Sequence, residues 1–351
     1  VYVAPGEHDE FYAFLSGGFS GQLAVYGLPS GRLFKVIPVF SVDAEKAYGF
    51  NEETKPMLNT SHGFVPWDDA HHPDISQTNG VLDGRFVFIN GNNTPRIAKV
   101  DLTTFETTEI IEIPNTAGNH SSSYVTENTE YVVAGTRFAI PVPQRDMPIK
   151  EYKGNFKGAL SFIKVDPKDG GMDLEFQILM PGFNYDKAHP GRGDSKDWFF
   201  FTTYNTEEAN TLLEVNASQN DKDFITAINW KKVADYVKNG GGKKMPANYA
   251  HNVYDDHTHS ATSTMKKEVL VIDPSEVPGA IYFLPTPKSP HGCDVSPTGE
   301  YIVGSGKLSA DLTVHSYTKM IKAIEDKAFD GDAYGIPILN FEAIHAGSVK
   351  Q

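Results

Sequence analysis

The sequence predicts an all-β fold, a β-propeller, and three observations lead to that prediction. The chain has 351 residues and is 40% hydrophobic, which is enough for one large closed fold or two domains. Its 31 Gly and 22 Pro are spread along the chain as turn residues rather than gathered in a linker. Blocks of alternating apolar and polar residues also recur, and about 40 to 45 residues per four-stranded unit is the spacing of propeller blades.

The strand-like blocks lie between turns rich in Gly, Asn, Pro or Ser, and in each block apolar and polar residues alternate. They cover 21–40, 84–114, 129–143, 158–181, 197–215, 268–287 and 299–308. Two other segments predict short helices, 230–242, which ends in Gly, and 317–329. A pair of stacked β-sandwiches is the alternative architecture for the same pattern.

Charge and composition exclude several classes of partner. The formal net charge of −14, with lysines clustered only in pairs, argues against nucleic acid or an anionic membrane as a partner. No stretch approaches the roughly 20 apolar residues that cross a bilayer. The chain opens at "VYVAPGEHDE" without a charged and apolar leader, so we expect any export signal to have been removed. The single cysteine, Cys293, excludes an internal disulfide, and we interpret it as a small buried hydrophobe.

Histidine is the residue type that points to chemistry. "WDDAHHPDIS" (67–76) places His71 and His72 side by side, and neighbouring side chains on a regular strand face opposite ways. We expect the pleat to break before Pro73, so that both rings turn towards the propeller axis and bind different atoms of one polynuclear cluster. His120 in "NTAGNHSSSY" and His291 in "KSPHGCDVSP" lie in loops of the kind that carry function on a rigid scaffold.

These segments resemble a known family. "DDAHHPDIS", "GNHSSS" and "PTPKSPHGCDVSPTGEYIVGSGKLS" are similar, in the same order, to the copper-ligand segments of nitrous oxide reductase. The opening "PGEHDEFYAFLSGGFSGQLAVYGLPSGR" and "DGRFVFINGNNTPRIAKV" resemble the first blades of that family, so the likeness spans essentially the whole chain. The family fold is a seven-bladed propeller, of which about five blades would be covered here.

The resemblance implies a copper-dependent oxidoreductase of denitrification. A tetranuclear copper-sulfide centre (CuZ type) would reduce N2O to N2 and water, with His71, His72, His120 and His291 as ligands. Imidazole suits copper, and the sulfide would be inorganic. Asp69 and Asp186 resemble carboxylates that orient the ligand imidazoles, although Asp186 in "FNYDKAHPG" fits a turn cap equally well.

A calcium site is also implied by the resemblance. "TTYNTEEAN" is similar to a family segment that binds Ca2+, which assigns Tyr204 and Glu207, with Asp223 in "NDKDF" as the aspartate ligand. Carboxylate oxygens suit calcium. The segment between Glu207 and Asp223 is longer than in the family, and Ser289 stands where the family often has an Asn ligand.

The rest of the family pattern is absent from this sequence. Three further histidine motifs and a C-terminal cupredoxin domain with a dinuclear copper site (CuA type) are not found, so we interpret 1–351 as the N-terminal portion of a propeller domain. Alone, this portion would not be expected to turn over substrate. The resemblance further implies a periplasmic location, a homodimer, and a cytochrome c or cupredoxin as electron donor.

Two other classes of function stay open from the residues alone. A non-catalytic propeller would serve as an interaction module, with its four histidines scattered. A calcium-dependent propeller hydrolase would instead gather Asp, Glu and Asn at the hub. The segment "GSGKLS" (304–309) is similar to a phosphate-binding loop but lacks its Ser/Thr and glycine spacing. The His-rich loop around His251, His257 and His259 is interpreted as solvated.

Overall fold

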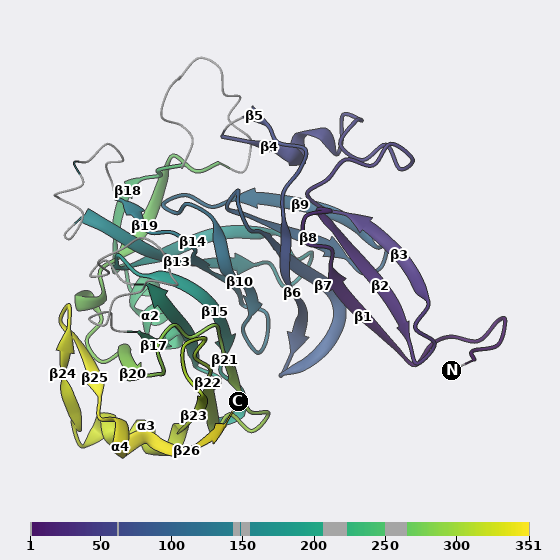
Figure 1. The fold of residues 1–351 in the computed structure, drawn as a ribbon. Helices are drawn as coiled ribbons and strands as arrows, with labels where there is room; N and C mark the ends of the chain where they lie inside the picture. The colour runs from purple at the N-terminus through teal and green to yellow at the C-terminus, as the bar shows by residue number, and fades with distance from the viewer. Residues whose placement is uncertain are drawn as a thin grey trace.

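The computed structural model describes residues 2–61, 63–142, 148, 155–205, 223–249 and 265–350. It is an all-β propeller, which confirms the predicted fold class (Figure 1). The described residues form five sheets of three or more strands. The first strands of these sheets, β1, β6, β10, β15 and β21, contact one another in sequence order and line the hub.

The first two sheets are antiparallel meanders. The first contains β1 (Phe11–Ser16), β2 (Gln22–Leu28) and β3 (Leu33–Pro38). The second contains β6 (Ala70–Thr78), β7 (Val81–Gly91), β8 (Arg96–Asp101) and β9 (Glu106–Glu112). Between them lie the one-turn helix η1 (Lys55–Leu58) and the short pair β4 (Asn59–Thr60) and β5 (Gly63–Phe64).

The third and fourth sheets are extended by strands from later in the chain. The third contains β10 (Asn119–Val125), β11 (Tyr131–Thr136), β13 (Phe156–Val165), β14 (Met172–Pro181), β19 (Glu268–Ile272) and β18 (Lys243–Pro246), with β12 (Ile140–Pro141) beside β13. The fourth contains β15 (Asn184–Pro190), β16 (Trp198–Asn205), β17 (Phe224–Asn229), β20 (Ile281–Pro285), β25 (Ile336–Leu339) and β24 (Phe329–Ala333).

The fifth sheet contains β21 (Cys293–Val295), β22 (Tyr301–Gly304), β23 (Asp311–Ser316) and β26 (His345–Lys350). Both predicted helices are confirmed, as α2 (Trp230–Lys238) and α3 (Tyr317–Glu325). The side chains of Asn229 and Ser316 cap them by accepting N–H groups of the first turn. Further short helices are η3 (Gly193–Ser195), η5 (Pro274–Glu276) and α4 (Phe341–Ile344). No described helix is long and apolar enough to span a membrane.

The core lies between neighbouring sheets rather than at one centre. On β7, Val87 and Ile89 pack with the first sheet, while Phe86 and Phe88 pack with the third. This is the two-residue alternation of a strand that is covered on both faces. The remaining clusters fill the spaces between the third and fourth sheets and between the fourth and fifth. Cys293 lies in the last of these, and burial raises the pKa of its thiol to about 12, so it behaves as the buried hydrophobe that the sequence predicted.

His315 makes the stability of the fold sensitive to pH. Its Nε2 donates to the main-chain oxygen of Pro285 at 2.9 Å, which joins β23 to β20. Burial lowers the pKa of His315 from 6.5 to about 4. The unfolded chain therefore takes up a proton near pH 6.5 and the native chain only near pH 4. Stability contributed by neutral His315 is full above pH 6.5 and falls by about 3 kcal/mol as the pH drops to 4.

We therefore expect His315→Gln to flatten the pH dependence of the unfolding free energy between pH 6.5 and 4. Urea unfolding at several pH values measures this, with exposed His8→Gln as the matched control. Equal slopes for His315→Gln and the unsubstituted protein would contradict the assignment.

Candidate metal centre

The adjacent histidines at the start of β6 face one cluster because the strand is irregular there. The pairing of β6 with β7 shifts register between His71 and Asp74, and His72 has φ +34°. The hydroxyl of Ser123 donates to the main-chain oxygen of His72 at 2.6 Å and holds this turn in place. A β-bulge of this kind re-aims a side chain. The predicted break in the pleat before Pro73 is confirmed, and the two ring centroids lie 4.8 Å apart.

His120 joins this pair from the start of β10, in the next sheet. Its ring centroid lies 5.2 Å from that of His71 and 4.8 Å from that of His72. One ring nitrogen from each of the three lies within 4.8 Å of the others. All three residues are partly buried. Three converging imidazoles are a donor set that suits a late transition metal.

His291 lies beside this trio but outside it. It precedes β21 and is exposed, and its ring centroid is 6.4 Å from that of His120. The structure therefore brings all four predicted histidines to one end of the hub, with three within a metal-binding distance of one another. The role of each as a ligand stays a prediction.

Two carboxylates each contact the Nδ1 atom of one histidine of the trio. Asp69 Oδ1 lies 3.1 Å from His71 Nδ1. Asp186 Oδ1 lies 2.7 Å from His120 Nδ1, and the main-chain oxygen of Asp186 lies 2.9 Å from the same nitrogen. Because carboxylate and carbonyl oxygens only accept, each Nδ1 carries the proton and each Nε2 keeps its lone pair for a metal. Asp186 therefore contacts an imidazole, as the resemblance implied, and is not only a turn residue.

The charge on Asp186 is stabilised by its neighbours. Burial alone would raise the pKa of Asp186. The hydrogen bond from His120, together with the charges of His120, Lys307 and His291, holds that pKa below its ordinary value. An ionised carboxylate at this position accepts the imidazole N–H more strongly than a neutral one would.

His72 contributes a buried nitrogen atom to the trio. Burial, and then the charges of His120, His71 and Lys187, lower its pKa to about 3. Its Nε2 is buried and makes no hydrogen bond to any residue that the structure describes. A buried polar atom without a partner costs about 1 to 3 kcal/mol, so it is retained where it has a use. A neutral imidazole of this kind is ready to bind a cation.

Three residues that support the carboxylates were not singled out from the sequence. Asn92 donates to Asp69 at 2.9 Å, and Arg137 donates to Asn92 at 2.6 Å. Lys307 pairs with Asp186 at 3.0 Å. Asn92 lies in "DGRFVFINGNNTPRIAKV" and Lys307 in "PTPKSPHGCDVSPTGEYIVGSGKLS", two segments that carry the resemblance, but neither segment indicates a role for these side chains. Their contacts depend on folded geometry, because each joins segments that are distant in sequence.

The predicted calcium residues are only partly described. Asp223 is buried, and its Oδ2 accepts the main-chain N–H of Ser289 at 2.8 Å. The structure thus joins the two segments in which the resemblance expected calcium ligands. The side chain of Tyr204 and the whole of Glu207 lie outside the described residues, as do His251, His257 and His259. The calcium site stays a prediction.

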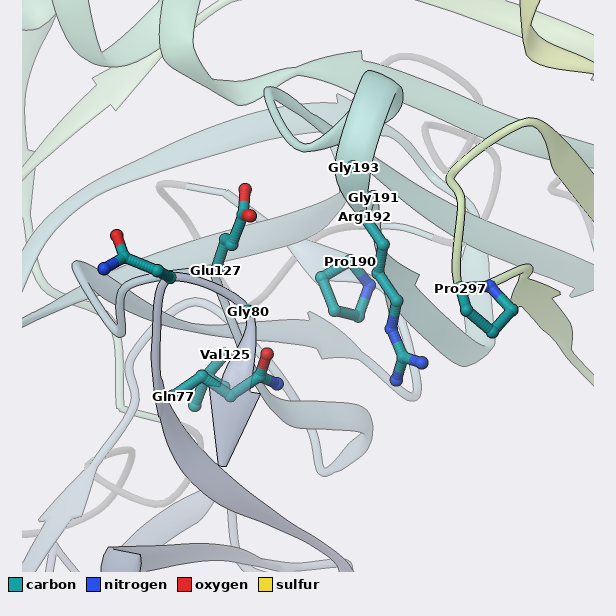
Figure 2. Close-up of a pocket in the computed structure, with 10 residues that line it drawn as sticks. Gln77, Gly80, Val125, Glu127, Pro190, Gly191, Arg192, Gly193 and Pro297 are labelled. Carbon is teal, nitrogen blue, oxygen red and sulfur yellow. The ribbon is translucent and has the colours of Figure 1, made fainter. Parts of the chain in front are cut away.

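A cavity of about 250 Å3 opens at the other end of the same inner strands (Figure 2). Gln77 near the end of β6, Val125 at the end of β10 and Pro190 at the end of β15 contribute to its wall, with the charged side chains of Glu127 and Arg192. Since the histidines lie at the starts of these strands, the cavity is separate from the histidine trio.

Comparison with known proteins finds similarity to nitrous-oxide reductases. The chain is 29% identical over 339 residues to nitrous-oxide reductase of Pseudomonas fluorescens, which covers 94% of this chain and 48% of that protein. It is 29% identical to the reductase of Stutzerimonas stutzeri and 30% identical to that of Ralstonia nicotianae, with 94% and 93% of this chain and 48% and 49% of those proteins covered. The resemblance seen in the sequence is confirmed. The chain spans about half the length of the curated relatives it matches.

Among solved structures, hydrazine synthase of Kuenenia stuttgartiensis is similar in fold. It has a TM-score of 0.54 at 12% identity and covers 99% of this chain and 73% of that one. At this identity the match concerns fold alone. No protein-family model matches the chain.

Proposed function

We propose that this chain is the propeller portion of a copper-dependent nitrous-oxide reductase. The observation that carries the proposal is the convergence of His71, His72 and His120, from two different sheets, on one point of the hub. The names of the similar proteins supply the substrate, N2O. The reaction takes N2O, two protons and two electrons to N2 and water, so one N–O bond is broken.

The residues present fit a copper centre. The donors are imidazole nitrogen atoms, and one of these nitrogens is buried without a partner among the described residues. No thiolate competes, because the buried thiol of Cys293 has a raised pKa. His71, His72 and His120 would hold the metal, with His291 beside them. When bound, a copper-sulfide cluster would supply the electrons for N–O cleavage.

The chain's own contribution is orientation, and it starts from the carboxylates. Asp69 and Asp186 keep the Nδ1–H form of His71 and His120, which leaves each Nε2 free to bind. The bulge at His72 fixes the third ring through the main chain. Tyr124 and Val125 of β10 pack into the clusters on either side of that strand, and Ala70 of β6 packs into the cluster between the first and second sheets.

Further parts of the proposed reductase rest on the resemblance described in the sequence analysis. We propose Ca2+ at Asp223, with Tyr204 and Glu207 as its other ligands. The dinuclear copper site would belong to a cupredoxin domain outside this sequence. A homodimer would bring that domain of one subunit close to the histidine cluster of the other. The electron donor would be a periplasmic cytochrome c or cupredoxin.

Copper and acid-labile sulfide in the protein purified without oxygen test the proposal. We expect both to be present, and we expect His120→Gln to lose copper while exposed His8→Gln retains it. N2O consumption by the whole protein with a chemical reductant gives the activity. Protein without copper, or copper retained equally by both variants, would favour a non-catalytic propeller instead.

A further inference from the structure

Two chains of polar contacts run from the imidazoles to cationic side chains. In the first, Arg137 Nη1 donates to Asn92 Oδ1 at 2.6 Å, and Asn92 Nδ2 donates to Asp69 Oδ2 at 2.9 Å. The other oxygen of Asp69 faces His71 at 3.1 Å. Both oxygens of Asp69 therefore accept a hydrogen bond. One accepts from the side-chain amide of Asn92, which is itself bonded to Arg137, and the other accepts from the ring N–H of His71.

The second chain has the same order without the intervening amide. Lys307 Nζ lies 3.0 Å from Asp186 Oδ2, and Asp186 Oδ1 lies 2.7 Å from His120 Nδ1. Asp69 and Asp186 are each only 3% exposed. A buried carboxylate that loses its cationic partner turns to find another donor, which weakens its hydrogen bond to the imidazole.

These two chains of contacts, which we call relays, each join different sheets around the hub. Arg137 follows β11 of the third sheet but acts on the second, where Asp69 precedes β6. Lys307 follows β22 of the fifth sheet, Asp186 lies on β15 of the fourth, and His120 lies on β10 of the third. Each cation therefore fixes an imidazole relative to a neighbouring blade and not only within its own.

The third imidazole of the trio is held differently. His72 is fixed through its main chain, by the bulge and the bond from Ser123, and within the described residues no carboxylate contacts its ring by hydrogen bond. The relays are therefore specific to His71 and His120, and their effects can be read separately with His72 as an internal reference.

We propose that Arg137 and Lys307 are positioning residues of the metal centre. Arg137, through Asn92 and Asp69, keeps His71 in its Nδ1–H form, and Lys307, through Asp186, does the same for His120. This inference rests on the proposed function, because copper binding is the use we assign to these tautomers. The tautomers themselves can be measured in the metal-free protein. Outer partners of ligand histidines typically change metal affinity by about 10- to 100-fold when removed.

The test uses Lys307→Gln and Arg137→Gln, each with its conservative partner, Lys307→Arg and Arg137→Lys. Lys164→Gln, which removes an exposed ion pair with Glu175, is the matched control. Histidine 15N NMR of the metal-free protein reports the tautomer of each ring, and titration with Cu2+ reports affinity. We expect Lys307→Gln to give a mixed tautomer at His120 alone and Arg137→Gln at His71 alone. Each should weaken copper binding by about 10- to 100-fold, and the conservative variants should restore both.

The possible outcomes separate this inference from the proposed function. Unchanged tautomers in both Gln variants, or a change at both rings from either substitution, would overturn the relays. A protein that shows the expected tautomers but takes up no copper would contradict the proposed reductase and support the relays. A protein that takes up copper but whose tautomers are unchanged in the Gln variants would support the proposed reductase and contradict the relays.

Discussion

His72→Phe is expected to remove high-affinity copper binding while leaving the metal-free protein at least as stable as before. The phenyl ring replaces an imidazole of similar size whose Nε2 is buried and makes no hydrogen bond to the described residues. Removing such an atom should stabilise the metal-free fold by about 1 kcal/mol, after allowance for the less favourable positive φ of Phe. Loss of a direct ligand should weaken copper binding by more than about 100-fold.

Two measurements on the same samples check the expected gain in stability without metal and the expected loss of copper affinity. Urea unfolding without metal gives the free energy of unfolding, and the copper-induced rise in that free energy gives the binding. His8→Gln is the control for loss of a histidine that lies outside the trio. If His72→Phe destabilises the metal-free protein by several kcal/mol, the imidazole is a structural residue with a partner, and its place in a metal centre is wrong.

The fold class was predictable because strand alternation is a local property. Residues 84–114 alternate in sequence and form β7, β8 and β9 in order. The sheet to which each strand belongs was harder to predict from the sequence. The block 268–287 reads as one unit, but β19 pairs in parallel with β14 of the third sheet, while β20 joins β17 of the fourth. That division is set by packing between blades, which no local pattern encodes.

The site shows the same division between local and distant information. The proline after two histidines predicted the irregular turn, and the structure places it between His71 and Asp74. Asp69 lies two residues from His71, and the resemblance implied its contact with an imidazole. Lys307 lies 121 positions from Asp186, and nothing near "GSGKLS" indicates an imidazole relay. Contacts of that kind appear only when the blades are assembled.

Arg96→Met is expected to destabilise the protein by about 3 to 5 kcal/mol, the largest stability effect predicted for this chain. Arg96 is fully buried and donates to Asp68 Oδ2 at 3.3 Å and to the main-chain oxygen of Val65 at 3.2 Å. Its guanidinium also lies over the ring of Phe40, 4.8 Å from the centroid. Methionine fills part of the volume but leaves the carboxylate of Asp68 buried without its cation.

The partner substitution shows whether that carboxylate is the cause. Asp68 is 1% exposed and also accepts the main-chain N–H groups of Asn93 and Thr94, so it joins the start of β6 to the turn before β8. In the double variant Arg96→Met/Asp68→Asn the buried charge is gone, and we expect about half of the lost stability to return. Exposed Arg85→Met should cost less than about 0.5 kcal/mol in the same urea experiment. If the double variant is no more stable than Arg96→Met, lost packing is the cause. If the charge is the cause, the pair stabilises the segment that leads into Asp69 and His71, and Arg96→Met should also weaken copper binding.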